Sequence, residues 1–566
     1  MNAKSAAMAL RLALVAALLL PCLAHAAKLR ERDSGWNPPP VVAPAPGETL
    51  PTIAELEARG AVIGQVFIRV FDVFDPTIKG EDNWLYRTAN KLHINTKEAT
   101  VRARLTFHEG EPVSHVRLEE SERSMRGQRY VYDAIVRPVR YDAATNTVDI
   151  EVSIRDVWTL NPGISFSSSG GANRERVELE ELNLLGWGKR LQLAYTSDDE
   201  RTQTELQWVD PNIFGSRWRM DTSYADLSDG TSMEFTLERP FFSLESTWAT
   251  GVDMRDDDRI VTRYSEADPY DGFRTKRRSL APWFGWSKGL KDGWTRRWFT
   301  GWTFDEARFE EEPGVTPPDE LIPERELSYP FIGLEWLEDA YGKARNQDQI
   351  MRTEDVYLGI AARVSAGMAT TALGSTQDAA ILKAAVQGGR DFTPKWRLIG
   401  NAQAATRVES GELANASLSA QAQNYWRFSD KQVFYASLTG TVTDNLDIEQ
   451  QLFLGAEQGL RGYRNRFQSG TSSALATIEY RLYTDWFPFR LFYVGGAAFV
   501  DAGRTWGRDP AGVAPLGLLT DIGIGLRFGS ARSGLGNVLH VDFAYALDAP
   551  PGEDKFQINI KTKKSF

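Results

Sequence analysis

The chain has 566 residues and a formal net charge of -11 at pH 7, so a broad basic face for nucleic acid is excluded on electrostatic grounds. Its 17 Trp, 18 Tyr and 28 Phe residues supply ample surface to bury, which excludes intrinsic disorder. A mean hydropathy of -0.36 is too polar for a bundle of membrane helices. A structured, polar chain rich in aromatic residues remains.

Residues 1–26 have the pattern of a secretory signal peptide. Two basic residues precede the apolar run Leu12–Leu20, and Ala24-His25-Ala26 supplies the small residues of a cleavage site. The only cysteine, Cys22, lies in this segment. We therefore expect an exported mature chain without disulfides or thiol chemistry.

Residues 27–59 are rich in proline, with Trp36-Asn37-Pro38-Pro39-Pro40 followed by Pro44-Ala45-Pro46. Consecutive prolines hold a chain extended and remove backbone donors. We therefore predict a semi-rigid leader that acts as a spacer.

Residues 60–160 have the pattern of a small α/β fold. About 95 residues can bury a single modest core, so we expect one domain. Its expected elements are a strand over Val62–Phe74, helices over Glu81–Leu92 and Pro112–Arg126, and strands over Val131–Tyr141 and Thr147–Trp158. In the last strand, apolar Val148, Ile150, Val152 and Ile154 alternate with polar Asp149, Glu151, Ser153 and Arg155. This alternation predicts a strand with one buried face and one solvated face.

From about residue 163 to residue 566 the helical period disappears. Segments of about ten residues alternate apolar and polar side chains and are separated by turn residues, the pattern of membrane-spanning strands. Fourteen of the 17 tryptophans lie after residue 162, many of them near segment ends, where a bilayer interface selects aromatic rings: Trp187, Trp218, Trp248, Trp294, Trp396, Trp426 and Trp486. These residues predict a transmembrane antiparallel β-barrel.

Connection lengths indicate how the barrel is oriented. Short connections such as Asp210–Ser216 fit the periplasmic side, and longer acidic or proline-rich ones, Arg255–Arg274 and Glu310–Glu326, fit the outer side. Counting the strand-like segments gives about twenty strands.

Three late motifs carry a resemblance to a known family. They are Leu460-Arg461-Gly462-Tyr463, Phe499-Val500-Asp501-Ala502-Gly503 and Gly523-Ile524-Gly525-Leu526-Arg527. Together with the α/β module before a strand-rich end, they make residues 60–566 resemble the BamA/TamA superfamily of outer-membrane barrel proteins, of the bacterial surface antigen type. The resemblance implies one periplasmic POTRA domain at 60–160 and a barrel at 163–566. It also implies about 16 strands, which we prefer to the twenty of the segment count.

The resemblance further implies a clamp inside the barrel, in which a long loop folds back into the lumen and its arginine grips the inner wall. Here the clamp would consist of Arg461, Gly462, Tyr463, Phe499, Asp501 and Gly503, with Glu479 as a possible second partner of Arg461. A guanidinium offers a planar fork that binds a carboxylate through two hydrogen bonds, and glycines remove bulk where loop and wall approach closely. A purely structural role for this pair stays equally open.

In the family, the first and last barrel strands meet at a weak seam that can part. The first strand here, 163–170, is short and rich in Ser and Gly, so it should pair loosely, while the last, 556–562, is a better strand. The seam residues would be Gly163, Phe166, Gly170, Phe556, Ile558 and Ile560. Lys564, two residues before the terminal Phe566, departs from the apolar pattern usual at this end.

Catalytic signals are poor. The four histidines of the mature chain lack metal-ligand spacing, and neither a nucleophile elbow nor a phosphate-binding glycine loop is present. We therefore predict no enzyme, no catalytic residue, no metal site and no cofactor. The acidic runs at 256–258 and 310–312 are most simply solvated loops, with contact to divalent cations or lipopolysaccharide as an alternative.

The leading hypothesis is an assembly or insertion factor of the outer membrane, with its N-terminal domain in the periplasm. It would capture an unfolded β-rich client polypeptide by strand addition and release it sideways through the barrel seam. Its other expected partners are outer-membrane lipid, lipopolysaccharide and accessory proteins of the periplasm or inner membrane, and not nucleic acid. A polypeptide secretion pore and a passive channel or surface antigen remain open, as do the client and the oligomeric state.

Overall fold

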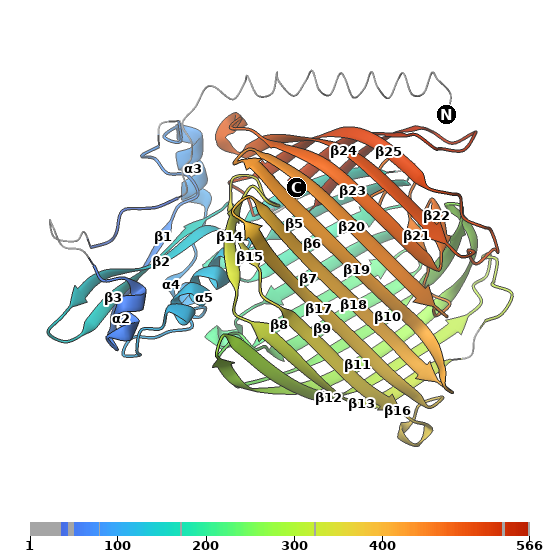
Figure 1. The fold of residues 1–566 in the computed structure, drawn as a ribbon, viewed down its shortest axis with the longest axis horizontal. Coiled ribbons are helices and arrows are strands. Elements are labelled where there is room, and N and C mark those ends of the chain that lie inside the picture. Colours follow the sequence, from blue (N-terminus) through green and yellow to red (C-terminus); the bar gives the residue numbers. More distant parts are fainter. Residues whose placement is uncertain are drawn as a thin grey trace.

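Two folded parts follow each other along the chain in the computed structural model, a small α/β domain and a large closed barrel (Figure 1). The structure describes residues 36–42, 50–78, 80–169, 172–321, 324–534 and 538–563. The predicted signal peptide at 1–26 lies outside these residues. No helix in the described ranges is both long and apolar enough to cross a bilayer.

The N-terminal domain has a three-stranded sheet in the order β1-β3-β2, with β1 parallel and β2 antiparallel to β3. Its elements are α2 (Ile53–Ala58), β1 (Val62–Phe71), α3 (Trp84–Leu92), α4 (Glu98–Arg102), α5 (His115–Arg126), β2 (Val131–Asp142) and β3 (Thr147–Asp156). The strand, helix, helix, strand, strand order expected from the sequence is present, with the short α4 added.

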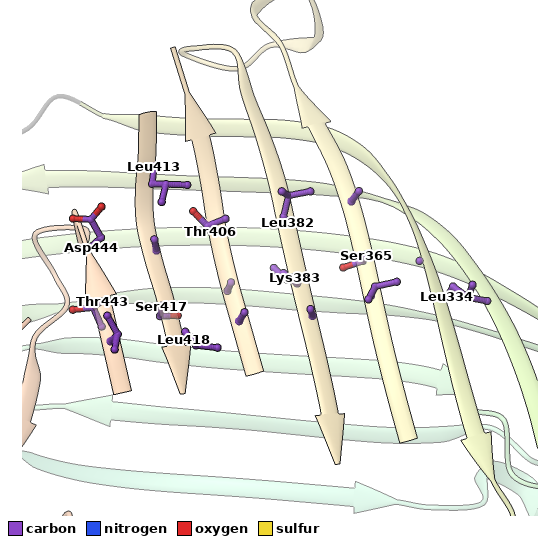
Figure 2. A pocket seen from close by; sticks show the side chains of 18 of the residues that line it. Leu334, Ser365, Leu382, Lys383, Thr406, Leu413, Ser417, Leu418, Thr443 and Asp444 are labelled. Carbon is purple, nitrogen blue, oxygen red and sulfur yellow. The ribbon is translucent and has the colours of Figure 1, made fainter. Parts of the chain in front are cut away.

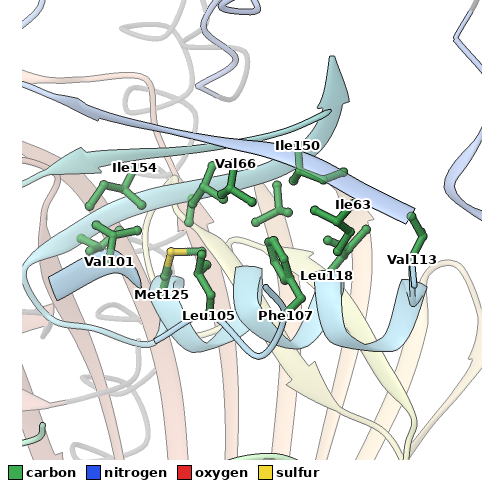
Figure 3. Close-up of a cluster of buried hydrophobic side chains, with 14 of the residues drawn as sticks. Ile63, Val66, Val101, Leu105, Phe107, Val113, Leu118, Met125, Ile150 and Ile154 are labelled. Atoms are coloured by element: carbon green, nitrogen blue, oxygen red, sulfur yellow. The ribbon is translucent and has the colours of Figure 1, made fainter. Parts of the chain in front are cut away.

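One face of this sheet packs on the helices and forms the core of the domain. Figure 3 shows Ile63, Val66, Ile150 and Ile154 of the sheet above Val101, Leu105, Phe107, Leu118 and Met125, all of them buried. Helix α2 completes this core through Leu56, which is fully buried. A capping box between Thr52 and Glu55 starts the helix. Residues 53–58, placed in the leader by the sequence, therefore pack as part of the domain.

The opposite face of β3 is also buried, so the expected solvated face is wrong. Residues 36–42 lie across it: Val41 donates its backbone N–H to Glu151 at 2.7 Å, and Arg69 and Arg137 each donate to a proline carbonyl of this segment at 2.7 Å. Arg137 also binds Glu151 at 3.1 Å. Polar side chains on this face are thus buried with their hydrogen bonds satisfied.

The barrel has 20 strands in the described residues, in one closed antiparallel order in which β27 neighbours β4. The count of segments is confirmed, and the sixteen strands preferred from the resemblance are wrong. The strands are β4 (Leu160–Ser169), β5 (Ala172–Glu181), β6 (Arg190–Ser197), β7 (Thr202–Asp210), β8 (Arg219–Leu227), β9 (Gly230–Arg239), β10 (Trp248–Ser265), β11 (Asp268–Lys291), β12 (Trp294–Glu310), β13 (Arg325–Glu338), β16 (Ala361–Ala369), β17 (Ala379–Thr393), β18 (Trp396–Glu409), β19 (Glu412–Ser429), β20 (Gln432–Asp444), β23 (Ser472–Tyr483), β24 (Phe492–Trp506), β25 (Leu519–Ser530), β26 (Val538–Ala546) and β27 (Phe556–Lys563).

Two small hairpins and four short turns complete the barrel part. The hairpins are β14 (Tyr341–Arg345) with β15 (Thr353–Tyr357), and β21 (Leu452–Leu454) with β22 (Gln468–Gly470). The 3-10 turns are η2 (Leu184–Gly186), η3 (Ile213–Gly215), η4 (Thr371–Leu373) and η5 (Pro488–Arg490). The α/β domain lies against one end of the barrel, which we name the domain-side rim; the other end is the far rim (Figure 1).

Connection lengths depart from the expected alternation on both rims. The connection from β13 to β16 on the domain-side rim spans residues 339–360, whereas two residues each join β8 to β9, β10 to β11 and β18 to β19 on the far rim. Strands β10 and β11 run through residues 255–274, which the sequence assigned to a long outer loop, and turn within Glu266 and Ala267. The acidic run belongs to the strand because arginines of β11 face it: Arg274 binds Asp258 at 2.7 Å and Arg278 binds Asp256 at 3.1 Å. Cross-strand pairs of opposite charge stabilise such a ladder.

The outer surface of the barrel is apolar. A groove of about 690 Å³ lies on the wall formed by β13 and β16 to β20. Figure 2 shows side chains that line it. Leucines 334, 382, 413 and 418 stand at its sides, and the small side chains Ala384 and Ala404, opposite each other on β17 and β18, lie between them. The seven tryptophans expected at segment ends all lie at or near strand ends on the domain-side rim. An apolar band with aromatic residues at its edge suits a bilayer.

The burial of Leu56 predicts that α2 stabilises the domain. Replacing Leu56 with Ala leaves a cavity in the core, so the free energy of unfolding of the domain should fall by about 2–5 kcal/mol. Hydrogen exchange of the full chain should show faster exchange in α2 and α5, with unchanged exchange in the barrel strands. Glu57→Ala, on the exposed side of the same helix, is the matched control. Equal exchange in the two variants would show that α2 is a spacer.

Candidate functional site in the barrel lumen

The connection from β20 to β23, residues 445–471, folds into the barrel, and we name it the lumen loop. It contains the β21–β22 hairpin, and its tip is residues 459–463. Apolar side chains seat it against the inner wall in one buried cluster of Leu454, Leu460, Tyr463, Phe467, Leu519 and Ala546. The loop therefore occupies the lumen as a packed element.

Arg461 at the tip grips the wall through three strands. Its Nε and Nη2 donate to the two carboxylate oxygens of Asp501 on β24 at 2.7 and 3.0 Å, and its Nη1 donates to Glu479 on β23 at 2.9 Å. The guanidinium also stacks 3.3 Å from the ring centroid of Phe499, and Asp542 of β26 lies 3.6 Å from Nη1. The structure thus brings together the predicted Arg461, Asp501 and Phe499, and Glu479 is a direct partner of Arg461.

Glu479 is shared between arginines. Arg481 donates to its other oxygen at 3.0 Å, and Arg527 lies 3.5 Å away and also binds Asp542 at 2.5 Å. All of these side chains are buried. The result is a buried network of three guanidinium groups and three carboxylates, which we name the lumen network: Arg461, Arg481, Arg527, Glu479, Asp501 and Asp542.

Glycines make room for this network. A Cβ on Gly462 would lie 2.6 Å from the Cβ of Asp521, whose carboxylate accepts the Gly462 N–H at 2.9 Å. Gly523 has the Phe499 ring against it and Gly525 has the Asp542 carboxylate against it, both too close for any larger residue. At Gly503 the approach to Leu454 is looser, at 3.1 Å. The glycines of the three motifs therefore serve one interlocked site.

Tyr463 fixes the tip of the lumen loop to strand β25. Its hydroxyl donates to the carbonyl of Thr520 on β25 at 2.9 Å, and its ring lies in the buried cluster of the loop.

The lumen loop also binds the last strand of the barrel. Asn559 of β27 donates to the carbonyl of Arg461 at 2.8 Å, and Lys561 of β27 donates to the carbonyl of Ala456 at 3.0 Å. The alternating Phe556 and Ile558 are exposed on the outside, and Ile560 is half-buried. The tip that carries Arg461 is therefore tied directly to one side of the seam.

The other side of the seam is partly described. Gly163 lies in β4, opposite Glu178 of β5, and Gly170 lies outside the described residues, as does the side chain of Phe166. Only residues 157–159 separate β4 from β3 of the α/β domain. The first barrel strand is therefore a direct continuation of the domain.

A second attachment holds the beginning of the lumen loop on the opposite wall. Asp447 accepts two hydrogen bonds from Arg407 of β18, at 2.7 and 2.8 Å, and lies 3.1 Å from Arg325 of β13. Arg325 also binds Glu449 at 2.6 Å. The loop therefore crosses the lumen and is fixed by buried charges at both ends.

The domain-side mouth of the barrel is filled by the connection from β13 to β16, residues 339–360, which we name the mouth hairpin. Its tip, 346–352, reaches the wall: the carbonyl of Gln347 accepts from Arg481 at 2.9 Å and from Tyr483 at 3.1 Å, and Tyr425 donates to Asp348 at 3.0 Å. Ile350 and Met351 lie in a buried cluster with tyrosines 132, 425, 435, 483 and 493. Arg481 thus joins the mouth hairpin to the lumen network.

The α/β domain covers the mouth hairpin from outside. Arg126 of α5 binds Asp355 through two hydrogen bonds of 2.7 Å, Lys343 binds Glu122 at 2.8 Å, and Thr353 donates to Asp133 at 3.1 Å. The lumen is therefore blocked at both ends, by the lumen loop and by the mouth hairpin under the domain.

Sequence reasoning missed several members of the site. Asp542 and Asn559 are polar positions in alternating strands, so the alternation that placed Ile558 outside could have placed them in the lumen. No sequence pattern indicated that Arg481 binds Gln347, because Gln347 is 134 positions away in a connection without a motif. Within the described residues, no group of three or more His, Cys, Asp or Glu side chains is placed to hold a metal ion.

The lumen network predicts a large effect for Arg461. Arg461→Ala leaves buried carboxylates without their cation, so the barrel should lose roughly 3–5 kcal/mol of stability. The urea concentration at which the folded, heat-modifiable band disappears on gels measures this loss. Arg464→Ala is the control, because Arg464 lies in the same lumen loop and binds the partly exposed Glu553. This ion pair should contribute about 0–1 kcal/mol to stability. Similar midpoints for the two variants would disprove the clamp.

Glu354 in the mouth hairpin predicts a pH dependence. Burial and the nearby Asp348 carboxylate raise the pKa of Glu354 to about 7, against the opposing backbone N–H groups of Gln347 and Asp348. A raised pKa favours the protonated, docked form, so this stabilisation is complete below the ordinary pKa of Glu and is lost as the pH rises through about 7. After division by the intrinsic, base-catalysed rate at each pH, hydrogen exchange in residues 341–357 should be faster at pH 8 than at pH 5. Glu354→Gln should remove this difference, and a difference that persists in the variant would refute the assignment.

Comparisons with known proteins agree with this architecture. Residues 361–566 match the family profile described as the Omp85 superfamily domain. This range contains the lumen loop and the residues of the lumen network. No curated protein matches the chain in sequence.

The solved structures that are similar to this chain include the following three. BamA from Haemophilus ducreyi lacking POTRA domains 1–3 is 13% identical, with 87% of this chain and 84% of that chain covered and a TM-score of 0.35. CdiB from Acinetobacter baumannii is 11% identical, with 88% and 74% covered and a TM-score of 0.43. CdiB from Escherichia coli is 13% identical, with 89% and 77% covered and a TM-score of 0.44. Residues 361–566, which contain all three motifs, are therefore similar to the Omp85 superfamily domain, in line with the resemblance to the BamA/TamA group.

Proposed function

We propose that this protein assembles or inserts β-rich client polypeptides in the outer membrane, by capture on a periplasmic POTRA domain formed by residues 60–160 and by opening of the seam between β27 and β4. The match of residues 361–566 to the Omp85 superfamily domain supports this class of function. The finer mechanism rests on how the two seam strands are attached.

The observation that carries the proposal is an asymmetry at the seam. Asn559 and Lys561 tie β27 to the lumen loop and so to the lumen network. β4 instead follows the α/β domain after residues 157–159, and the Trp158 N–H donates to the carbonyl of Arg532 in the connection between β25 and β26 at 2.8 Å. A movement of the domain that breaks this contact would pull on β4 while β27 stays tied to the lumen loop.

Capture of a client would use the sheet of the domain. In the order β1-β3-β2, the edge strands are β1 and β2, and an exposed edge binds an extended peptide through backbone hydrogen bonds. Part of the β2 edge is occupied in this state, because Arg352 of the mouth hairpin donates to the carbonyl of Val131 at 2.8 Å. A client strand that displaces this contact would loosen the mouth hairpin as it binds.

No nucleotide or cofactor enters the mechanism. The driving free energy comes from the client, whose own strands pair and bury apolar surface in lipid as its barrel closes. The protein contributes a template edge at the opened seam and lowers the barrier to insertion.

Reconstitution in liposomes tests the proposal. The wild-type protein should accelerate the insertion of an unfolded barrel client, measured as its protection from added protease. Arg461→Ala, which frees β27 from the lumen network, should insert the client more slowly, whereas the control Arg464→Ala should match the wild type. Ion conductance without any acceleration of insertion would overturn the proposal and favour a channel.

A polypeptide secretion pore is the second candidate, favoured by one feature of the lumen. On β17, side chains from Leu382 to Gln387 are exposed on both faces, so water reaches the inner wall beside this strand. Release of the mouth hairpin would join this space to the periplasmic mouth. A client found inside the liposomes, and not in their membrane, would favour this candidate.

A further inference from the structure

Helix α3 turns an apolar face away from the domain. Its Trp84, Leu85 and Leu92 side chains are 74%, 55% and 69% exposed. With 3.6 residues per turn, these positions project within an arc of roughly 100°. The opposite side holds the helix on the domain, where Tyr86 stacks on Phe74 with ring centroids 4.3 Å apart. Nothing in the fold of the domain explains this exposed face.

The helix lies along the domain-side rim below the seam. At its beginning, the Tyr86 hydroxyl donates to the carbonyl of Phe489 in the turn between β23 and β24 at 2.5 Å. Just after its end, Lys97 donates its backbone N–H to the carbonyl of Gly186 in the turn between β5 and β6 at 2.9 Å. In the barrel order, β25, β26, β27 and β4 lie between these two turns. Residues 81–97 therefore pass beneath the junction of β27 and β4.

Three turns on the same rim expose a large apolar residue in a strained conformation. Leu185, Phe214 and Phe489 have φ values of 54°, 50° and 52°, and their side chains are 55%, 99% and 76% exposed. A bulky residue in the left-handed region costs roughly 1–2 kcal/mol, and exposure to water offsets none of it. Contact with lipid would offset it, since burial of such a side chain contributes about 1.5–3 kcal/mol.

The position of the bilayer follows from these residues together with the tryptophans of the rim. The seven rim tryptophans mark the headgroup level of a bilayer, as aromatic belts do. Trp187, next to the exposed Leu185, has the Lys97 ammonium 3.9 Å above its ring, so the chain just after α3 lies at this level. The apolar face of α3 is therefore continuous with the lipid boundary of the barrel.

We infer that α3 is an interfacial helix that anchors the α/β domain to the lipid leaflet on the domain side of the barrel. Trp84, Leu85 and Leu92 enter the region between headgroups and acyl chains, and the exposed Arg87 and Lys91 at the edge of the apolar face bind lipid phosphates. The inference rests on the proposed placement of this domain in the periplasm, but not on client insertion.

Lipid fits this surface better than a polypeptide does. A groove that binds a peptide offers concave walls or an open sheet edge, whereas α3 presents a convex helix with basic residues beside its apolar arc. Because the apolar face of α3 is continuous with the lipid boundary of the barrel, lipid should contact both surfaces.

A single fluorescent probe tests the anchor. Cys22 is the only cysteine of the sequence and lies in the predicted signal peptide, so Leu92→Cys and Glu57→Cys, an exposed control on α2, each place a single thiol in the mature chain. Each variant is labelled with an environment-sensitive dye and folded in vesicles of phosphatidylethanolamine and phosphatidylglycerol. The dye at position 92 should emit at shorter wavelength and be quenched by headgroup-level spin-labelled lipid at least about twofold more than the dye at position 57.

Two results would overturn the anchor. One is equal quenching of both dyes by aqueous iodide with no quenching by spin-labelled lipid. The other is protection of position 92 only after an unfolded client is added, which would make α3 a client-binding surface. A protein that shows lipid quenching at position 92 but does not accelerate client insertion would retain the anchor and lose the proposed function.

Substitution of a second position guards against a local effect of the dye. Leu85→Glu places a charge in the apolar arc without touching the contact of Tyr86 with Phe489, and it should reduce lipid quenching of the dye at position 92. The heat-modifiable gel band confirms that the barrel is folded in this variant. Unchanged quenching in a folded barrel would count against the anchor.

Discussion

Everything in the lumen depends on keeping charged groups paired away from water. Arg461 has nearly no contact with solvent, and an unpaired guanidinium in such a place would cost several kcal/mol. The cost is offset only because Asp501 meets its fork with two hydrogen bonds and Glu479 takes a third. Lysine could not replace it, since an ammonium lacks the planar fork that reaches both carboxylates. The lumen loop is therefore fixed in one position rather than loosely packed.

The network also transmits position, because one carboxylate serves several arginines. Glu479 joins Arg461 of the lumen loop to Arg481, and Arg481 holds the carbonyl of Gln347 in the mouth hairpin. The lumen loop and the mouth hairpin, which block the lumen, are thus linked through Glu479 and Arg481 on β23. Release of the mouth hairpin removes one hydrogen-bond acceptor from Arg481 and changes the field at Glu479, so the two ends of the lumen are coupled by contact.

The sequence predicted the parts of this protein that follow a local period. Alternation predicted the barrel and a count of about twenty strands, although the resemblance favoured sixteen. The pairing of Arg461 with Asp501 was implied by the resemblance of three motifs to a known family. The capping box of Thr52 and Glu55 was also visible, yet the prolines around it concealed α2 within an expected spacer. The acidic run at 256–258 was assigned to a loop because its compensating arginines lie on the next strand, and pairing of strands is a non-local property.

Long-range contacts account for what could not be predicted. The burial of both faces of β3 requires residues 36–42 to return to the sheet, where the Val41 N–H binds Glu151 over a separation of 110 residues. The mouth hairpin has no recognisable motif, and its tip is defined by side chains of β19 and β23 that lie far ahead in the chain. The strand number suggested by the family failed for a related reason, since a shared clamp involves only the last strands of the barrel and does not constrain how many precede them.

The attachment of the domain determines which movements can open the seam. Arg129 of the domain binds Glu180 of β5 at 2.6 Å, and Arg126 binds Asp355 of the mouth hairpin at 2.7 Å through side chains that are mostly buried. Movement of the domain away from the barrel must break these pairs, whereas the described ion pairs of the lumen network lie within the barrel and can stay intact. With α3 anchored in the leaflet, this movement follows the plane of the membrane, because swinging away from it would expose Trp84 and Leu92 to water. In the proposed mechanism, a lateral shift of the domain would draw β4 away from β27, because β4 continues directly from β3, and would open the barrel toward lipid rather than toward the periplasm.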